Sequence, residues 1–147
     1  MKEDTINSFR EFNRFYTRII GVTNNHILES KYSLTEVRVM YEIYHNPEIT
    51  ARQIKEIIEV DEGYLSRLIK KLVKQNIIKK EKSDTDSRIS RLLLSELGEE
   101  IFLKLNQNSS DSIAKLISHL NLNEKAELLA NFQSIKTLLT KGSKNEH

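Results

Sequence analysis

The sequence predicts a mainly α-helical protein with one small β-hairpin. Its 147 residues include only four glycines and one proline, so long helices with few tight turns are expected. Apolar residues recur at spacings of three and four along most of the chain, which is the period of an amphipathic helix. That period breaks once, over 77–94, where two short β-rich runs flank a polar turn.

Composition limits the classes of function. The length suits one domain, 1–147, and 38% hydrophobic with 30% charged residues is typical of a folded chain. The absence of cysteine excludes disulfides, thiolate metal sites and cysteine nucleophiles. The longest stretch without a charge, 19–28, is too short to span a membrane, and 1–4 do not open a signal peptide. We therefore expect a cytoplasmic protein without membrane partners.

The first predicted helix covers 5–30, and a second begins at Ser33. The first carries one apolar stripe, formed by Ile6, Phe9, Phe12, Tyr16, Ile19 and Ile20. The second opens on Ser33-Leu34-Thr35-Glu36, a capping box in which the side chains of Ser33 and Glu36 each accept the other's backbone amide. It ends at Asn46, because Pro47 cannot continue a helix.

Two shorter helices follow. Thr50-Ala51-Arg52-Gln53 is a second capping box and opens a helix that carries Ile54, Ile57 and Ile58. Asp61 caps the next helix, over 61–74, whose predicted core stripe is Leu65, Leu68, Ile69, Leu72 and Val73.

The predicted hairpin and two long helices complete the chain. Runs at 77–82 and 89–94 flank the polar turn 83–87 and form a hairpin with a projecting tip. Ser95 caps a helix that reaches about His119, and Asn123 caps a final helix that ends near Leu139. The polar segment 141–147 is expected to fray.

Positive charge is concentrated in one segment. The net charge of the chain is only +2, but 64–91 holds nine lysines and arginines against three acids. That segment therefore carries +6, while the rest of the chain carries −4. Such a segment is either a solvated helix face or a surface that faces phosphates, and its place within the predicted helices and hairpin favours phosphates.

The order of elements over 33–94 is that of a winged helix-turn-helix, in which one helix enters the DNA major groove and the hairpin forms a wing. The exposed face of the 61–74 helix presents small and polar residues first and lysines later, as expected for base edges followed by phosphates. The residues predicted to bind DNA are Thr50, Arg52, Glu62, Gly63, Ser66, Arg67, Lys70, Lys74, Lys82, Asp86, Arg88 and Arg91.

The hairpin also resembles a known family. Asp86-Ser87-Arg88-Ile89-Ser90-Arg91-Leu92-Leu93-Leu94-Ser95, followed by Gly98, is similar to the wing signature D-x-R-x-x-x-L-x-L-T-x-x-G of the MarR family of transcriptional regulators. Its one mismatch is Ser95 for threonine, which keeps a helix cap. Two further stretches, 12–18 with 32–36 and 61–67, most resemble the MarR-like half of proteins fused to a GNAT-type acetyltransferase.

The resemblance covers about 8–139 and implies a mode of action. It implies an α-rich homodimer, held by 5–30 and 95–140, that binds pseudo-palindromic operators in double-stranded DNA. It also implies a ligand-responsive repressor whose small aromatic or lipophilic effector binds near Phe15, Tyr41, Tyr44 and Phe102. One departure concerns the turn before the 61–74 helix, where the family usually carries glycine and this chain has Glu59, a strained residue if its φ is positive.

Alternatives remain open on the residues alone. Arg88 could pair with Asp86 only to stiffen a surface hairpin, and Tyr41, Tyr44 and Phe102 could be core residues. The chain could also be a helical protein-interaction module that has lost DNA binding. No P-loop, G-x-S-x-G or H-E-x-x-H motif occurs, so we expect no enzyme and no cofactor. The histidines are scattered, so no metal site is expected.

Overall fold

The computed structural model describes residues 2–28 and 30–143. Its elements are the helices α1 (Glu3–Leu28), α2 (Leu34–His45), α3 (Ala51–Ile58), α4 (Glu62–Lys74), α5 (Glu96–Leu116) and α6 (Leu122–Leu139), and the strands β1 (Ile78–Lys82) and β2 (Ser90–Leu94). The chain divides into two compact units, Met1–Ser110 and Asp111–His147. The predicted fold class, mainly helical with one antiparallel hairpin, is confirmed.

The cap of α2 differs from the predicted box. The Ser33 hydroxyl accepts the Glu36 amide at 3.2 Å, as expected. The Glu36 carboxylate instead accepts the Ser33 hydroxyl at 3.2 Å and the Lys71 ammonium of α4 at 3.1 Å. A lysine that is distant in sequence supplies a charge-assisted hydrogen bond, and such a bond is stronger than one from a neutral amide.

The turn between α3 and α4 has the left-handed geometry that usually requires glycine. The α3 cap is the predicted box, because Thr50 Oγ1 accepts the Gln53 amide and Gln53 Oε1 accepts the Thr50 amide. Glu59 then ends α3 at φ 51° and ψ 51°. The Asp61 carboxylate accepts the Tyr64 amide at 3.0 Å and starts α4, as predicted.

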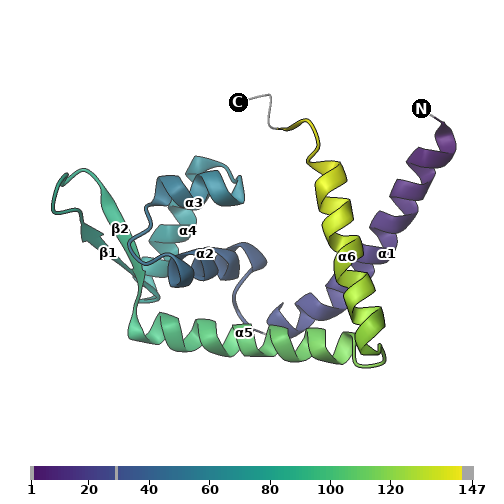
Figure 1. Ribbon diagram of the computed structural model, residues 1–147. Coiled ribbons are helices and arrows are strands. Elements are labelled where there is room, and N and C mark those ends of the chain that lie inside the picture. Colours follow the sequence, from purple (N-terminus) through teal and green to yellow (C-terminus); the bar gives the residue numbers. More distant parts are fainter. Residues whose placement is uncertain (1, 29, 144–147) are drawn as a thin grey trace. The chain divides into compact units, whose positions relative to one another are not determined.

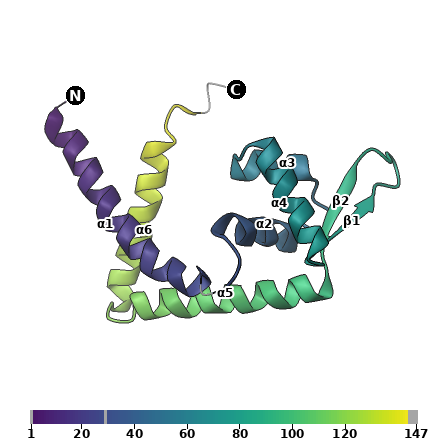
Figure 2. The same cartoon turned by 180° about the vertical axis from the view of Figure 1, so that it is seen from behind.

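The wing is formed by β1, β2 and the turn between them, and it projects beside α3 and α4 (Figures 1 and 2). The strands pair antiparallel from Ile78 with Leu94 to Lys82 with Ser90, so each is one residue shorter than predicted. The loop before α3 joins the outer edge of β2, where the Leu92 amide donates to the Ile49 carbonyl at 2.8 Å and Thr50 bridges Arg91.

The last two helices differ from the sequence prediction at their ends. Ser95 caps α5 through the Gly98 amide, but α5 ends at Leu116 rather than near His119. The cap of α6 is Asn121 and not Asn123. Asn121 and Glu124 form a reciprocal box, since Asn121 Oδ1 accepts the Glu124 amide and Glu124 Oε1 accepts the Asn121 amide.

The core of the first unit lies among α2, α3, α4, the wing and the start of α5. Its largest fully buried side chains include Met40, Ile54, Ile69, Leu72, Ile77 and Phe102. Val73, which was predicted to lie in the core stripe of its helix, is exposed instead, because it lies at the margin of the helix's apolar face. Ile57 of α3 is exposed as well. Gly98 passes so close to the Ile77 carbonyl that a Cβ would overlap the oxygen, and this contact seats α5 against β1.

Candidate nucleic-acid interface

Helix α4 buries one face and exposes the other. Leu65, Leu68, Ile69 and Leu72 face the core. The predicted DNA-binding residues of this helix all lie exposed on the remaining surface: Glu62, Gly63, Ser66, Arg67, Lys70 and Lys74. The helix therefore presents small and polar groups near its first turn and cations farther along, as the sequence suggested.

Gly63 makes room for the side chain of Arg67. A Cβ at Gly63 would lie 3.4 Å from Arg67 Nη1 and 3.2 Å from Asp61 Oδ2. The guanidinium of Arg67 therefore extends back over the first turn of α4. The sequence contained no signal for this fit between residues 63 and 67.

Three of the predicted DNA contacts, at the start of α3 and of α4, have partners within the protein. Arg52 pairs with Glu56 at 3.8 Å, and Glu62 pairs with Lys55 at 3.4 Å across the α3–α4 turn. Thr50 uses its hydroxyl to cap α3. Lys82 is exposed at the end of β1, opposite Ser90.

The tip of the wing is organised around Asp86. Its carboxylate accepts the Arg88 amide at 3.0 Å and the Arg88 guanidinium at 3.1 and 3.2 Å. The guanidinium and then the amide of Arg88 lower the pKa of the Asp86 carboxyl below its ordinary value, so the carboxylate is charged at neutral pH. The side chain of Arg88 is nevertheless 88% exposed.

Arg91 has a different environment. Its side chain is only 24% exposed and pairs with Glu48 at 2.8 Å and with Asp84 at 3.6 Å. Its Nε is buried without a hydrogen-bond partner among the residues that the structure describes. Arg91 and Arg88 were both predicted to contact DNA, but in the structure Arg88 is exposed whereas Arg91 is largely covered and paired with two carboxylates.

The predicted effector residues come together only in part. The ring of Phe102, buried on α5, lies 4.8 Å from that of Tyr44 and 6.3 Å from that of Tyr41, both half-exposed on α2. His45 joins them with its ring 4.1 Å from Tyr41. Phe15 lies on α1, where its ring contacts are with Phe12 and Arg18.

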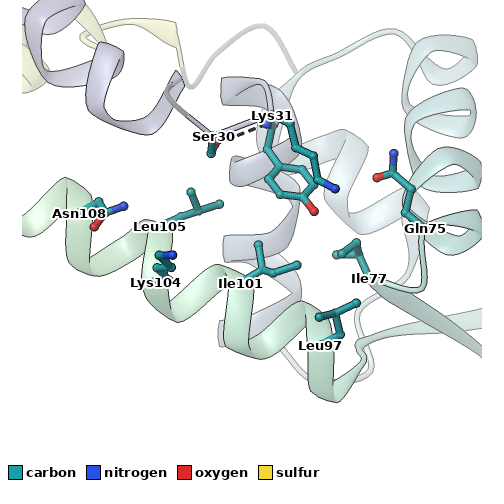
Figure 3. Close-up of a pocket in the computed structure, with 10 residues that line it drawn as sticks. Ser30, Lys31, Gln75, Ile77, Leu97, Ile101, Lys104, Leu105 and Asn108 are labelled. Atoms are coloured by element: carbon teal, nitrogen blue, oxygen red, sulfur yellow. Dashed lines mark hydrogen bonds between the residues drawn. The ribbon is translucent and has the colours of Figure 1, made fainter.

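A hollow of about 540 Å³ lies elsewhere, between the loop before α2, the end of α4 and α5 (Figure 3). Its apolar floor includes Ile77, Ile101 and Leu105, and Lys31 and Lys104 stand at its rim. None of the four predicted effector residues is among the ten that line it. The sequence could not indicate this hollow, because its walls come from three segments that are far apart in the chain.

Candidate metal sites and membrane-spanning helices are absent from the part of the chain that the structure describes, residues 2–28 and 30–143. In that part of the chain no group of three or more histidine, aspartate or glutamate residues is arranged to hold a metal ion. No helix within those residues is long and apolar enough to cross a membrane.

Sequence comparisons point to one family. Residues 32–90 match the model of the MarR family. Over 89 residues, 60% of this chain, the protein is 28% identical to the HTH-type transcriptional regulator BilQ of Clostridium symbiosum. It is 30% identical over 99 residues, 66% of this chain, to the uncharacterized HTH-type transcriptional regulator YybA of Bacillus subtilis. These matches span 62% and 66% of the two curated relatives, just under two thirds of their lengths.

Solved structures share the fold. A mutant of MarR from E. coli, complexed with operator DNA, superposes with a TM-score of 0.74 at 20% identity, over 90% of this chain and 95% of that one. The PcaV regulator from Streptomyces coelicolor, in complex with its natural ligand, has a TM-score of 0.69 at 15% identity, over 85% and 89%. The family model, the relatives and the shared winged fold confirm the resemblance seen in residues 86–98, and the chain belongs to the MarR family.

Proposed function

We propose that this protein is a sequence-specific, double-stranded DNA-binding transcriptional regulator that acts as a ligand-responsive homodimeric repressor. One observation carries the DNA-binding part. The exposed face of α4 presents Arg67, Lys70 and Lys74 while the exposed Arg88 stands at the tip of the adjoining wing. A helix of this kind fits a major groove, and an arginine on a hairpin tip fits the neighbouring minor groove.

The exposed residues divide into roles. Arg67, whose guanidinium lies over the first turn of α4, suits base edges, while Lys70 and Lys74 lie farther along the helix and suit phosphates. Arg88 suits a narrow, electronegative minor groove, and Asp86 sets the direction of its guanidinium. This function needs no catalytic step, and we place it in the cytoplasm with the DNA.

The dimer part rests on exposed apolar side chains at both ends of the chain. On α1, Phe9, Phe12 and Phe15 are each at least half exposed. On α6, Leu122, Leu129 and Leu138 are more exposed still. Apolar surface of this extent is characteristic of an interface, and a second copy would bury it with two-fold symmetry. Light scattering should give twice 17.2 kDa at micromolar concentration, and a mass of 17.2 kDa would contradict the dimer.

The ligand-responsive part rests on the aromatic cluster and on the family. PcaV was solved with its natural ligand, and Tyr41, Tyr44 and Phe102 offer rings to an aromatic or lipophilic effector. An effector weakens DNA binding only by its differential affinity for the two conformations of the dimer. A screen of aromatic acids and lipophilic compounds should find one that changes DNA affinity, and uniformly negative results would remove this part of the proposal.

The DNA-binding test begins with random-sequence duplexes. Rounds of selection with the protein should enrich a pseudo-palindromic duplex, and gel shifts at low and moderate salt should show preference for it over a scrambled duplex. Binding that vanishes at moderate salt for both duplexes, or that shows no preference, would favour the alternative of a protein-interaction module without specific DNA binding.

A further inference from the structure

We propose that Arg91 is a positioning residue of the wing and not a DNA contact. With Glu48 and Asp84 it locks β2 to the loop that precedes α3, which fixes the wing relative to the helices. The lock holds Arg88 at the distance from α4 that a minor groove requires. This inference rests on the proposed DNA-binding function for its consequence, though the lock itself can be tested without DNA.

The backbone already joins the wing to this loop. The Leu92 amide donates to the Ile49 carbonyl at 2.8 Å, and Thr50 pairs with Arg91 as an isolated antiparallel bridge. Residues 48–50 therefore add a short third segment to the edge of the two-stranded sheet. Thr50 is also the cap of α3, so the helix-turn-helix begins where this segment ends.

The side chains clamp the same junction. Arg91 Nη1 donates to Glu48 Oε1 at 2.8 Å, and Nη2 lies 3.6 Å from Asp84 Oδ2 on the wing turn. Glu48 has φ 75°, a left-handed conformation that non-glycine residues rarely adopt without compensating contacts. One guanidinium thus ties together the loop, β2 and the turn of the wing.

Several observations separate this role from a direct phosphate contact. Arg91 is 24% exposed, whereas Arg88 is 88% exposed. To reach a phosphate, Arg91 would have to break its ion pairs with Glu48 and Asp84. The two carboxylates would then stand unpaired beside the negatively charged DNA. Glu48 and Asp84 are the groups that make Arg91 unavailable, and they also make it useful as a lock.

The charge of Glu48 gives opposite expectations for the two roles. We would measure binding to the duplex selected by the wild-type protein. Under the lock, Glu48→Gln should weaken binding about fivefold to tenfold, because a charge-assisted hydrogen bond is lost. If Arg91 touched a phosphate instead, Glu48→Gln would free the guanidinium and remove a negative charge, and binding would tighten. Unchanged or tighter binding therefore overturns the proposal.

A double-mutant cycle tests whether Arg91 acts through Arg88. Arg88→Ala should lose much less affinity in an Arg91→Met background than in the wild type, and the preference for A·T-rich flanks should fall in Arg91→Met. The proposal is overturned if the affinity losses of Arg88→Ala and Arg91→Met are independent of each other. It is also overturned if Arg91→Met loses affinity equally for duplexes of every flanking sequence. Arg38→Met, which removes an exposed arginine from α2, is the matched control for loss of one positive charge and should change affinity less than about twofold.

Hydrogen exchange tests the lock in the free protein. The Leu92 amide should exchange faster in Glu48→Gln and Arg91→Met than in the wild type and in Arg38→Met. If Leu92 exchange is unchanged in both variants, the lock is absent. The wild type could bind no DNA while the Leu92 amide still exchanges faster in Glu48→Gln and Arg91→Met. In that case the proposed function has failed and the structural lock stands.

Discussion

Arg88 and Asp86 form a three-bond pair at the tip of the wing. The guanidinium donates from Nε to Oδ1 at 3.1 Å and from Nη2 to Oδ2 at 3.2 Å, and the Arg88 amide donates to Oδ1 at 3.0 Å. The sequence allowed either a stiffened hairpin or an arginine directed at DNA. The structure is compatible with both roles at once. The pair uses two of the five guanidinium N–H groups and leaves the side chain 88% exposed.

The pair predicts an acidic shift for Asp86. Its pKa should lie below the ordinary value of 3.8, because the Arg88 side chain and amide stabilise the carboxylate. A lowered pKa stabilises the fold above pH 3.8, and that contribution is lost as the pH falls through the lowered value. An NMR titration of the carboxyl carbon measures this, and Arg88→Gln should return the pKa toward 3.8. A wild-type pKa at or above 3.8 would contradict the pairing in solution.

Arg88→Ala should weaken DNA binding without unfolding the protein. The side chain is 88% exposed and forms a surface ion pair with Asp86, so the free energy of unfolding should change by less than about 0.5 kcal/mol. The affinity loss should be largest on duplexes with A·T-rich flanks, where the minor groove is narrow. Gel shifts with A·T-rich and G·C-rich flanks check this. Equal binding by Arg88→Ala and the wild type at moderate salt would leave the wing with a structural role only.

Arg67 and Lys74 should behave differently when truncated. Arg67→Ala should cost about 1–3 kcal/mol in binding and relax sequence preference at one position of each half-site, as for a base contact. Lys74→Ala should weaken all sequences alike and reduce the salt dependence by about one unit of slope per site. Binding isotherms at several salt concentrations with the selected duplex and its single-base variants separate the two patterns. Identical behaviour of the two variants would refute the division of roles.

Gly98→Ala should destabilise the first unit. An added Cβ would overlap the Ile77 carbonyl oxygen, which is held by the Ser95 amide, so α5 or β1 must shift. We expect a loss of about 1–3 kcal/mol in the free energy of unfolding. Gly21→Ala is the matched control, because its Cβ would meet nothing within 4 Å and alanine favours a helix. Urea unfolding followed by circular dichroism measures both, and equal stability of the two variants would show that the close approach is absent.

Glu59→Gly should stabilise the protein slightly. Glu59 sits at φ 51° and ψ 51°, which costs a non-glycine residue about 1–2 kcal/mol. Glycine removes that cost but gains freedom in the unfolded chain, so the net increase should be roughly 0.5–1 kcal/mol. Glu59→Ala keeps the Cβ and should give no such gain. A Glu59→Gly variant no more stable than Glu59→Ala would mean that the turn is not strained.

Local patterns were enough for most elements. Each of these patterns depends on residues that are close together in the sequence. Examples are the box of Thr50 and Gln53, the Asp61 cap and the change of period near residue 77. They are therefore readable in a single sequence. Some errors occurred where the deciding partner lies far away, as when Lys71 of α4 binds the Glu36 carboxylate at the start of α2. The cap of α6 is a different case, because the box of Asn121 and Glu124 is local and the sequence analysis still placed the cap at Asn123.

The candidate interface divides in the same way. The sequence by itself determined the fold class, the family and the exposed cations of α4, because helical period and a local wing motif encode them. Only the tertiary structure decided that Arg88 is exposed while Arg91, three residues later, is held by Glu48 and Asp84. The physical reason is that alternation along a strand is a local property, whereas the carboxylate that captures Arg91 is brought to β2 by the loop between α2 and α3.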